Sequence, residues 1–320
     1  MGERKNLIKM KELTFGELLR QSHNCLEEKH LQKMRTENLR LELVNMKNDI
    51  IEFDEDVKRE FESGGPLFEI NLVPFQPSII IGKKKKIKNV LVIMIGISEY
   101  IDNERWPNLS GVKEDDTENF KQLFEQELNY TFVCNSSPKM TKENIQNFMN
   151  QVIIDHGLRN NTNKYDGLIM IFCGYGGRGD EGDVLVTSDG KYIPIAKFQD
   201  SFDCERMQSF EDFPKIFIID VCHTKIAEPQ KSAIRGIRGL RNYDGFLVIW
   251  STTKGNTVGK LSLLSQCMKN IVTSTYKSGY SFNQMLQDIM TEICNKNEWH
   301  CVESKNAIDY YIVFQQRKSV

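Results

Sequence analysis

Two segments of this chain combine residues that could do chemistry with a position at the end of an apolar run. Cys222 follows the run 216–221 and precedes His223, so a thiol stands among polar residues at the exit of a predicted strand. A cysteine in such a place could act as a nucleophile, although a lone cysteine is more often a structural thiol. The second segment, Gly174-Tyr175-Gly176-Gly177, follows the run 167–173. Both segments are candidates for a functional site.

Gly174, Gly176 and Gly179 also match the GxGxxG pattern of dinucleotide-binding loops. That pattern is meaningful only where a helix opens at its end. Here residues 180–186 read as a turn followed by a strand-like run. No GxxxxGK[ST] sequence is present, which excludes a P-loop. We therefore expect no nucleotide and no other cofactor.

Alternating strands and helices position these segments. Continuous apolar runs at 90–97, 167–173, 216–221 and 246–250 are typical of strands buried on both faces. Helices are predicted at 114–127, 141–154, 262–275 and 281–294, with Thr141 as an N-cap, and shorter strands at 130–134 and 310–314. This alternation predicts an α/β fold with an open, largely parallel sheet between helices, in which catalytic groups gather at the carboxyl ends of the strands.

The first sixty residues follow a different pattern. Between Leu13 and Phe61 there is no proline and a single glycine. Apolar residues recur there at steps of three and four, which predicts a helix: Leu39, Leu43, Met46, Ile50, Phe53 and Val57. This helix could pack on its own domain or dock on a partner, including a second copy of the chain. We therefore expect a helical extension at 1–63.

A linker is expected at 64–88, between the helical extension and the α/β domain. It contains the basic run Lys83–Lys86. The run could serve as a nuclear-import or anionic-surface patch, or as a solvated lead-in to the next strand.

Composition limits the function classes. The chain has 320 residues, with 42 Lys and Arg against 44 Asp and Glu, so no global charge favours nucleic acid or acidic membranes. No stretch approaches the roughly 18 apolar residues of a membrane span, and the start lacks the apolar core of a signal peptide. The eight cysteines form no CxxC pair. These features predict a cytoplasmic protein with reduced thiols, without zinc, membrane or nucleic-acid partners.

Several segments together carry a family resemblance. They are the run VLVIMIGISEY from Val90, Leu109 with Gly111-Val112, the block Cys173-Gly174-Tyr175-Gly176, the hairpin-like stretch 181–190, the strand 215–222 ending on Cys222, and the stretch 245–252. In this arrangement the chain from about 89 to 251 resembles the caspase, metacaspase and paracaspase group of cysteine peptidases. In caspases the histidine lies about 50 residues before the cysteine. Tyr175 lies 47 residues before Cys222.

The resemblance implies a fold and an activity. It implies a six-stranded mixed sheet between helices at 89–320, with a large-subunit-like part 89–224, a linker 225–244 and a small-subunit-like part 245–320. The family hydrolyses peptides with a Cys–His dyad. Cys222 would occupy the nucleophile position, and the backbone N–H groups of Cys222 and Gly176 would hold the oxyanion.

The departure from the family pattern lies at the histidine, where this chain has Tyr175. A phenol titrates near pH 10, so it is neutral at pH 7, a poor base, and unable to become a cation beside the thiol. Losing general acid–base help typically lowers a rate by about 10²–10⁴-fold. His223 adjoins Cys222 on the same strand, whereas His156 and His300 lie elsewhere in the chain, so none is expected to substitute.

The expected specificity pocket is acidic. Asp220 stands two residues before Cys222, and Asp116 matches the second acidic pocket residue of metacaspases and paracaspases. Two such carboxylates suit an Arg or Lys side chain, although each could also be an ordinary structural or solvated carboxylate. The arginine expected in the pocket of true caspases is not visible in residues 255–260.

Two further loops leave alternatives open. An acidic turn could bind calcium or be a simple hairpin turn, and we assign no metal to it: Asp180, Glu181 and Asp183. The basic linker 225–244 could be a self-cleavage segment or an uncut loop.

These observations predict a caspase-like protein that has lost its dyad. We expect a pseudopeptidase that binds or regulates peptide or protein partners. The alternative is a slow or conditional cysteine endopeptidase that uses Cys222 and cleaves after Arg or Lys.

Overall fold

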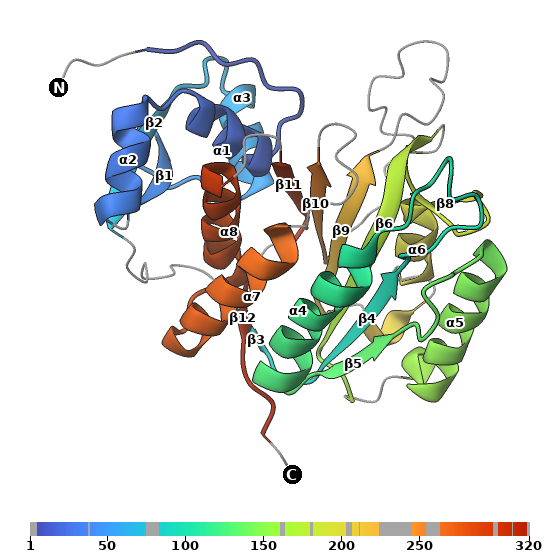
Figure 1. Cartoon of the computed structure of the whole chain (residues 1–320). Coiled ribbons are helices and arrows are strands. Elements are labelled where there is room, and N and C mark those ends of the chain that lie inside the picture. The colour runs from blue at the N-terminus through green and yellow to red at the C-terminus, as the bar shows by residue number, and fades with distance from the viewer. Residues whose placement is uncertain are drawn as a thin grey trace.

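The computed structural model describes residues 5–37, 39–74, 83–160, 164–179, 182–202, 207–210, 212–223, 245–253, 263–296, 300–308 and 310–318. Its central element is a sheet in which six strands follow one path (Figure 1). Along that path they are β11 (His300–Asn306), β10 (Phe246–Thr253), β9 (Lys215–His223), β6 (Gly167–Gly179), β4 (Val90–Gly96) and β5 (Thr131–Cys134). All neighbouring pairs are parallel except β11 with β10, which is antiparallel. The predicted open, mostly parallel six-stranded sheet is confirmed.

The strand positions follow from burial on both faces. Six consecutive residues of β4, Val90–Ile95, have no exposed surface, and residues 168–173 of β6 and 215–221 of β9 are all buried. A strand with no solvated face needs a continuous apolar run, which is the pattern that predicted these strands. Beyond Gly174, β6 turns into a hairpin with β7 (Gly182–Val186), which pairs in turn with β8 (Tyr192–Pro194).

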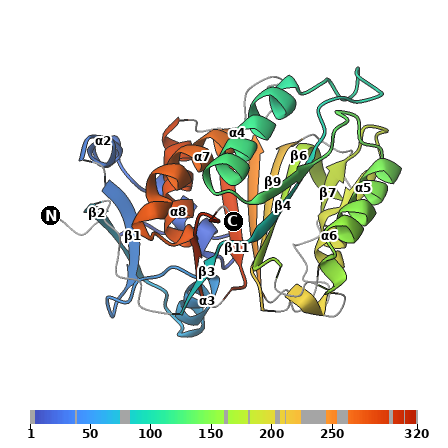
Figure 2. The ribbon, with the colours of Figure 1, turned by 90° about the horizontal axis from the view of Figure 1, so that it is seen from below.

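Helices cover both faces of the sheet (Figure 2). One face carries α4 (Thr117–Lys121), α7 (Leu263–Thr275) and α8 (Phe282–Lys296), and the other carries α5 (Lys142–Asp155) and α6 (Ile195–Ser201). The helix containing α4 is extended on each side by π-helical turns, Val112–Asp116 and Gln122–Glu127. Short 3₁₀ turns lie at Leu158–Asn160, Gln208–Phe210 and Tyr276–Ser278.

The helix after Thr141 begins as predicted. The Thr141 hydroxyl accepts a hydrogen bond from the Asn144 amide at 3.2 Å, and the Asn144 side-chain oxygen accepts one from the Thr141 amide at 3.1 Å. This reciprocal capping box satisfies two of the N–H groups that a helix start leaves without partners.

The N-terminal region is mixed rather than helical throughout. It contains α1 (Phe15–Asn24), α2 (Glu28–Glu37), β1 (Leu39–Asn45), α3 (Asp54–Glu62) and β2 (Phe68–Pro74), and β1 pairs antiparallel with β2. The predicted helix from Leu39 to Val57 is therefore wrong. Residues 39–43 alternate apolar and polar with period two, which is the strand pattern, and Asn48 has a φ of +63° in the turn that follows.

The residues of the proposed apolar stripe are consequently divided. Leu43 and Val57 are buried inside the chain, whereas Met46 and Ile50 are 70% and 46% exposed in and beside the turn. The prediction of self-association through one helical stripe from Leu39 to Val57 therefore loses its structural basis.

Two short elements near the C-terminus also differ from expectation. The predicted strand at 310–314 exists as β12 (Tyr311–Phe314), but it pairs in parallel with β3 (Lys84–Ile87) and not with the main sheet. The basic run thus forms a strand, and Lys85 Nζ lies 4.7 Å from the centre of the Phe213 ring. The sixth strand of the sheet is β11, which the sequence pattern did not reveal.

Among the described residues no helix is long and apolar enough to cross a membrane.

Candidate active site and acidic pocket

The two strand ends singled out in the sequence lie side by side. β6 and β9 are parallel neighbours, and their register pairs Tyr175 with Cys222 and Gly176 with His223. Cys222 is half-buried, whereas Tyr175 is only 4% exposed. Because paired residues of neighbouring parallel strands project to the same face of the sheet, the thiol and the phenol lie on one face, toward the carboxyl end of β9.

Tyr175 is held by its own neighbours. Its hydroxyl donates a hydrogen bond to the Pro107 carbonyl at 2.8 Å, and its backbone N–H donates to the Tyr100 hydroxyl at 2.9 Å. Its ring centre lies 5.0 Å from that of Tyr100 and 5.4 Å from that of Trp106. Burial, with the nearby Cys222 as a smaller cause, raises the pKa of Tyr175 to about 12. The phenol therefore stays protonated at neutral pH, and its hydroxyl donates its hydrogen bond to a backbone carbonyl.

The glycines around Tyr175 are required by close packing. A Cβ on Gly176 would lie 2.6 Å from Cγ2 of Val221, which no real side chain tolerates. Gly174 has a φ of +150°, and a Cβ there would lie 2.9 Å from the Tyr100 hydroxyl. The glycines thus let β6 pass closely beside β9 and the Tyr100 loop, a structural reason for the pattern that resembled a dinucleotide fingerprint.

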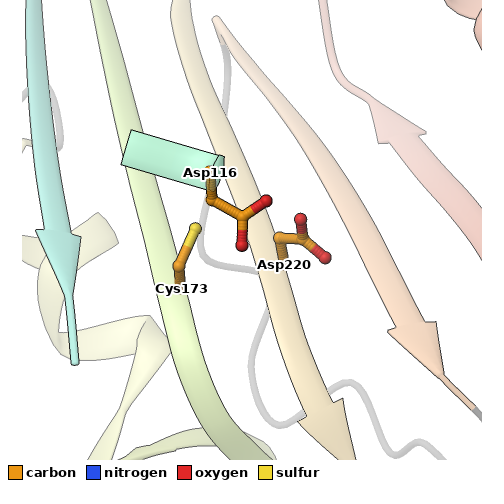
Figure 3. Close-up of side chains that lie close together, drawn as sticks. All are labelled: Asp116, Cys173 and Asp220. Atoms are coloured by element: carbon orange, nitrogen blue, oxygen red, sulfur yellow. The ribbon is translucent and has the colours of Figure 1, made fainter. Parts of the chain in front are cut away.

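A second cluster lies beside this pair. Asp116, from the π-helical turn before α4, meets Cys173 of β6 and Asp220 of β9, and their ligand atoms all lie within 4.8 Å of one another (Figure 3). All three residues are buried. The two carboxylates predicted to line the specificity pocket are therefore adjacent.

Burial and charge repulsion dominate the electrostatics of this acidic pocket, by which we mean Asp116, Cys173 and Asp220. Burial first, and then the nearby Asp220, raise the pKa of the Asp116 carboxyl well above its ordinary value. Burial and the two carboxylates raise the pKa of the Cys173 thiol well above its ordinary value. Asp116 and Cys173 therefore each hold their proton to a higher pH than they would in water, and a cation beside them would lower both pKa values.

Sequence reasoning did not find every residue at this pocket. The Ser265 hydroxyl, from α7, donates a hydrogen bond to Asp116 Oδ1 at 2.6 Å. No sequence signal places Ser265 there, because the two residues are 149 positions apart. Cys173 stood in the quoted motif but was not assigned to the pocket. Side chains alternate between the two faces of a strand, so Cys173 lies on the same face of β6 as Tyr175. This alternation could have predicted that Cys173 lies beside the two carboxylates.

The model of the caspase domain family matches residues 89–311. This chain belongs to the caspase domain family. The matched range contains the Tyr175–Cys222 pair and the whole acidic pocket.

Solved caspase structures share the fold of this caspase domain. The initiator caspase Dronc of Drosophila is similar over 74% of this chain and 92% of its own, with a TM-score of 0.56 and 16% identity. Caspase-1 of Spodoptera frugiperda is similar over 77% of this chain and 98% of its own, with a TM-score of 0.54 and 14% identity. Its pro-form is similar over 71% and 94%, with a TM-score of 0.53 and 16% identity. A comparison with curated protein sequences finds no match.

None of the histidines that the structure describes in the caspase domain stands at the position opposite Cys222. His156 Nδ1 lies 2.7 Å from the Tyr165 hydroxyl, at the end of α5. His300 begins β11 and pairs with Thr253, two strands away from β9. The backbone of His223 pairs with Gly176, so it continues β9 beyond Cys222.

Some sequence predictions fall outside the described residues. These are Asp180 and Glu181 of the acidic turn, the basic linker 225–244, and residues 255–260, where the pocket arginine of true caspases was sought. Asp183 of the turn is described and pairs with Arg178 in the β6–β7 hairpin. Within the described part of the chain, the cluster of His, Cys, Asp and Glu that could hold a metal ion is the acidic pocket itself.

Proposed function

We propose that this caspase-domain protein is a pseudopeptidase that binds peptide or protein partners through the acidic pocket without cleaving them. The observation that carries the proposal is Tyr175, which stands directly opposite Cys222 in the β6–β9 register and donates its hydroxyl proton to the Pro107 carbonyl. The resemblance assigns this position to the histidine that acts as general acid and base.

The phenol cannot perform that work. A general base needs a pKa near the operating pH, and the pKa of Tyr175 is raised to about 12. A neutral phenol also gives the Cys222 thiolate no positive neighbour, so its nucleophilicity gains no electrostatic help. Loss of this assistance lowers the rate by about 10²–10⁴-fold even where the oxyanion site persists.

The pocket nevertheless suits a basic side chain. Asp116 and Asp220 lie together beneath the strand ends, and the Asp116 carboxyl is oriented by Ser265. A guanidinium or ammonium group entering there would make charge-assisted hydrogen bonds, worth about 1.5–3 kcal/mol each. We place this binding in the cytoplasm, where the buried free thiols Cys173 and Cys267 would stay reduced.

The test is binding measured separately from turnover. We expect peptides with Arg or Lys at the cleavage position to bind the purified chain by calorimetry, and peptides with Asp there not to bind. Asp220→Asn should weaken binding by about tenfold or more, which corresponds to the loss of one charge-assisted contact. Cys222→Ala serves as the matched control and should bind as tightly as the unchanged chain.

Turnover decides between the proposal and its rival. We expect no hydrolysis of Arg, Lys or Asp peptides by the unchanged chain. Robust hydrolysis that disappears in Cys222→Ala would overturn the pseudopeptidase reading.

The rival is a slow or conditional cysteine endopeptidase with Arg or Lys preference. It is favoured by Cys222, which is half-buried next to an intact acidic pair. In that case the basic linker 225–244 is the natural site of self-cleavage. A thiol-reactive peptide probe with a basic residue at the cleavage position would label Cys222 and spare Cys222→Ala.

A further inference from the structure

The acidic pocket contains a thiol as well as two carboxylates. Cys173 has no exposed surface, and Figure 3 shows its sulfur turned toward the Asp116 carboxylate. Among the residues that the structure describes, this sulfur has no hydrogen-bond partner. A buried polar group without a partner is rare in a folded protein, so its place beside two carboxylates points to a ligand that all three groups share.

The charges around the pocket favour a cation as that ligand. The charged neighbours of Asp116 are two further carboxylates, Asp220 and Asp115. The hydrogen bond that Asp116 receives comes from a neutral hydroxyl, that of Ser265. Carboxylates buried side by side repel each other when both are ionised. A cation bound between them would replace this repulsion with attraction.

The donor atoms are placed for one small ion. Zn²⁺ binds thiolate sulfur at about 2.3 Å and carboxylate oxygen at about 2.0–2.2 Å in tetrahedral geometry, which sets neighbouring donors about 3.5 Å apart. The donor atoms of Asp116, Cys173 and Asp220 all lie within 4.8 Å of one another. The widest pair would therefore close by about 1.3 Å at most, a distance that side-chain rotation covers. The fourth position would be left to water or to an incoming group.

The donor set also selects among ions. Ca²⁺ takes six to eight oxygen ligands and Mg²⁺ takes six, whereas this cluster offers three donors, one of them sulfur. Thiolate is a soft ligand that favours Zn²⁺ over Mg²⁺ and Ca²⁺.

A chain of hydrogen bonds holds one carboxylate in place. Lys269 Nζ, on α7, donates to Asn119 Oδ1 of α4 at 2.6 Å. Asn119 Nδ2 donates to the Ser265 oxygen at 3.2 Å, and Ser265 donates in turn to Asp116 Oδ1 at 2.6 Å. Outer partners of this kind orient the carboxylates that bind metal ions. Asp116 Oδ2 is thereby left to face an ion.

We propose that Asp116, Cys173 and Asp220 form a binding site for a thiophilic divalent cation of the Zn²⁺ type. The sulfur binds as thiolate, and its proton passes to solvent. Local spacing of cysteines and histidines, on which the expectation of a protein without zinc was based, does not register such a site, because its donors come from three elements remote in sequence.

The site has a consequence for the peptide pocket. An ion and a basic side chain would use the same two carboxylates and therefore compete. This consequence rests on the proposed function, whereas the metal site itself does not.

The test measures metal binding to the purified full chain without peptide. Calorimetry with Zn²⁺ gives the affinity, and bound Co²⁺ should show the charge-transfer absorption of a cobalt–thiolate bond. Cys173→Ser keeps the shape of the side chain and removes the thiolate, so it should abolish this absorption and weaken Zn²⁺ binding by about 100-fold or more. Ser265→Ala should keep the absorption and weaken Zn²⁺ binding by about 10–100-fold.

The matched controls are thiols outside the cluster. Cys222→Ala and Cys134→Ser should bind Zn²⁺ as tightly as the unchanged chain and keep the Co²⁺ absorption. Circular dichroism checks that each variant is folded. If Cys173→Ser does not fold, Asp116→Asn, which keeps an acceptor for Ser265, should show the same loss of Zn²⁺ binding. Equal Zn²⁺ affinity in the unchanged chain and in the folded ligand variant would overturn the proposal, and so would an absorption that disappears in Cys222→Ala.

A second arm separates the metal site from the proposed function. A peptide with Arg at the cleavage position should weaken Zn²⁺ binding to the unchanged chain, and a peptide with Asp there should not. Zn²⁺ binding that depends on Cys173 but is indifferent to saturating Arg peptide would refute the peptide pocket and leave the metal site standing. Arg peptide that binds the chain while Zn²⁺ affinity is the same in Cys173→Ser would refute the metal site alone.

Discussion

Tyr175 shows how one substitution is absorbed by its neighbours. The phenol is larger than an imidazole, and its ring packs against Tyr100 and Trp106 while its hydroxyl reaches the Pro107 carbonyl. The side chain is thus stabilised by contacts that have no connection with acid–base chemistry. The position opposite Cys222 is therefore filled by a buried phenol whose hydroxyl is hydrogen-bonded to a backbone carbonyl.

Restoring the imidazole is the sharpest test at this scale. Tyr175→His should place a base with a pKa near 6.5 across from Cys222 and raise hydrolysis of Arg or Lys peptides by about 10²–10⁴-fold. Steady-state kinetics on peptides that differ only at the cleavage position measure the gain. Adding Asp220→Ala should remove most of it, because the basic side chain loses a carboxylate partner.

The matched control is Tyr175→Phe, which keeps the ring and removes the hydroxyl. It should give no activity and lower stability by about 0.5–1.5 kcal/mol, since the Pro107 carbonyl loses its donor. A gain on Asp peptides would mean that the pocket is not acidic in function. No gain in a folded Tyr175→His protein would mean that the site has changed at further positions.

At the scale of elements, single carboxylates join segments that are remote in sequence. Asp116 links the helix containing α4 to α7 through Ser265, and Asp54 links α3 to α1 and β11. Both are buried, and burial raises the pKa of each above its ordinary value. Each junction should therefore respond to pH.

Asp54 allows the sign of that response to be predicted. Burial, opposed by its two backbone hydrogen bonds, raises the pKa of Asp54 from 3.8 to about 6. The folded state then holds this proton more tightly than the unfolded state, so the contribution of Asp54 to stability is greatest below about pH 4 and is lost as pH rises through 6. The full change is about 3 kcal/mol.

The measurement is the free energy of unfolding in urea, compared between the unchanged chain and Asp54→Asn at several pH values. The stability of the unchanged chain relative to the variant should fall between about pH 4 and pH 6 and then level off. A relative stability that rises over that range would refute the assignment.

At the scale of the whole molecule, the N-terminal region and the caspase domain share one apolar core. Phe15, Leu18 and Val57 belong to the same buried cluster as the sheet residues. A sequence boundary near residue 64 therefore cuts through packed surface. Such a boundary separates regions of different sequence pattern without separating two independent cores.

Deleting residues 1–63 should accordingly destabilise the remainder. Each fully buried Leu or Val contributes about 1.5–3 kcal/mol, and the deletion also uncovers the apolar side of β11 and α8 that these residues cover. We expect a lower midpoint of urea unfolding and aggregation of the truncated chain. Deleting only residues 1–7, which end in the fully exposed Leu7, is the control and should leave the midpoint unchanged. A truncated chain as stable as the whole would place the domain boundary at 64.

The sequence by itself determined the elements whose signal is local. Strands buried on both faces need continuous apolar runs, so β4, β6, β9 and β10 could be predicted, and with them the meeting of Tyr175 and Cys222 at one sheet edge. The helix start at Thr141 was equally predictable, because the residues that form a capping box lie within four positions of the sequence. The family pattern supplied Asp116 and Asp220.

Only the tertiary structure decided features that depend on remote partners. Residues 39–57 carry both a helical and an alternating pattern, and pairing with β2 selects the strand β1 over the helix. β11 has no continuous apolar run and therefore gives no local strand signal. It contacts α1 and α8, and its pairing with β10 places it at the sheet edge. Ser265 reaches Asp116 across 149 positions, and Asp54 reaches Asn306 across 252. Such contacts form because folding brings together groups that each need a partner once buried, and no local spacing records which partner that will be.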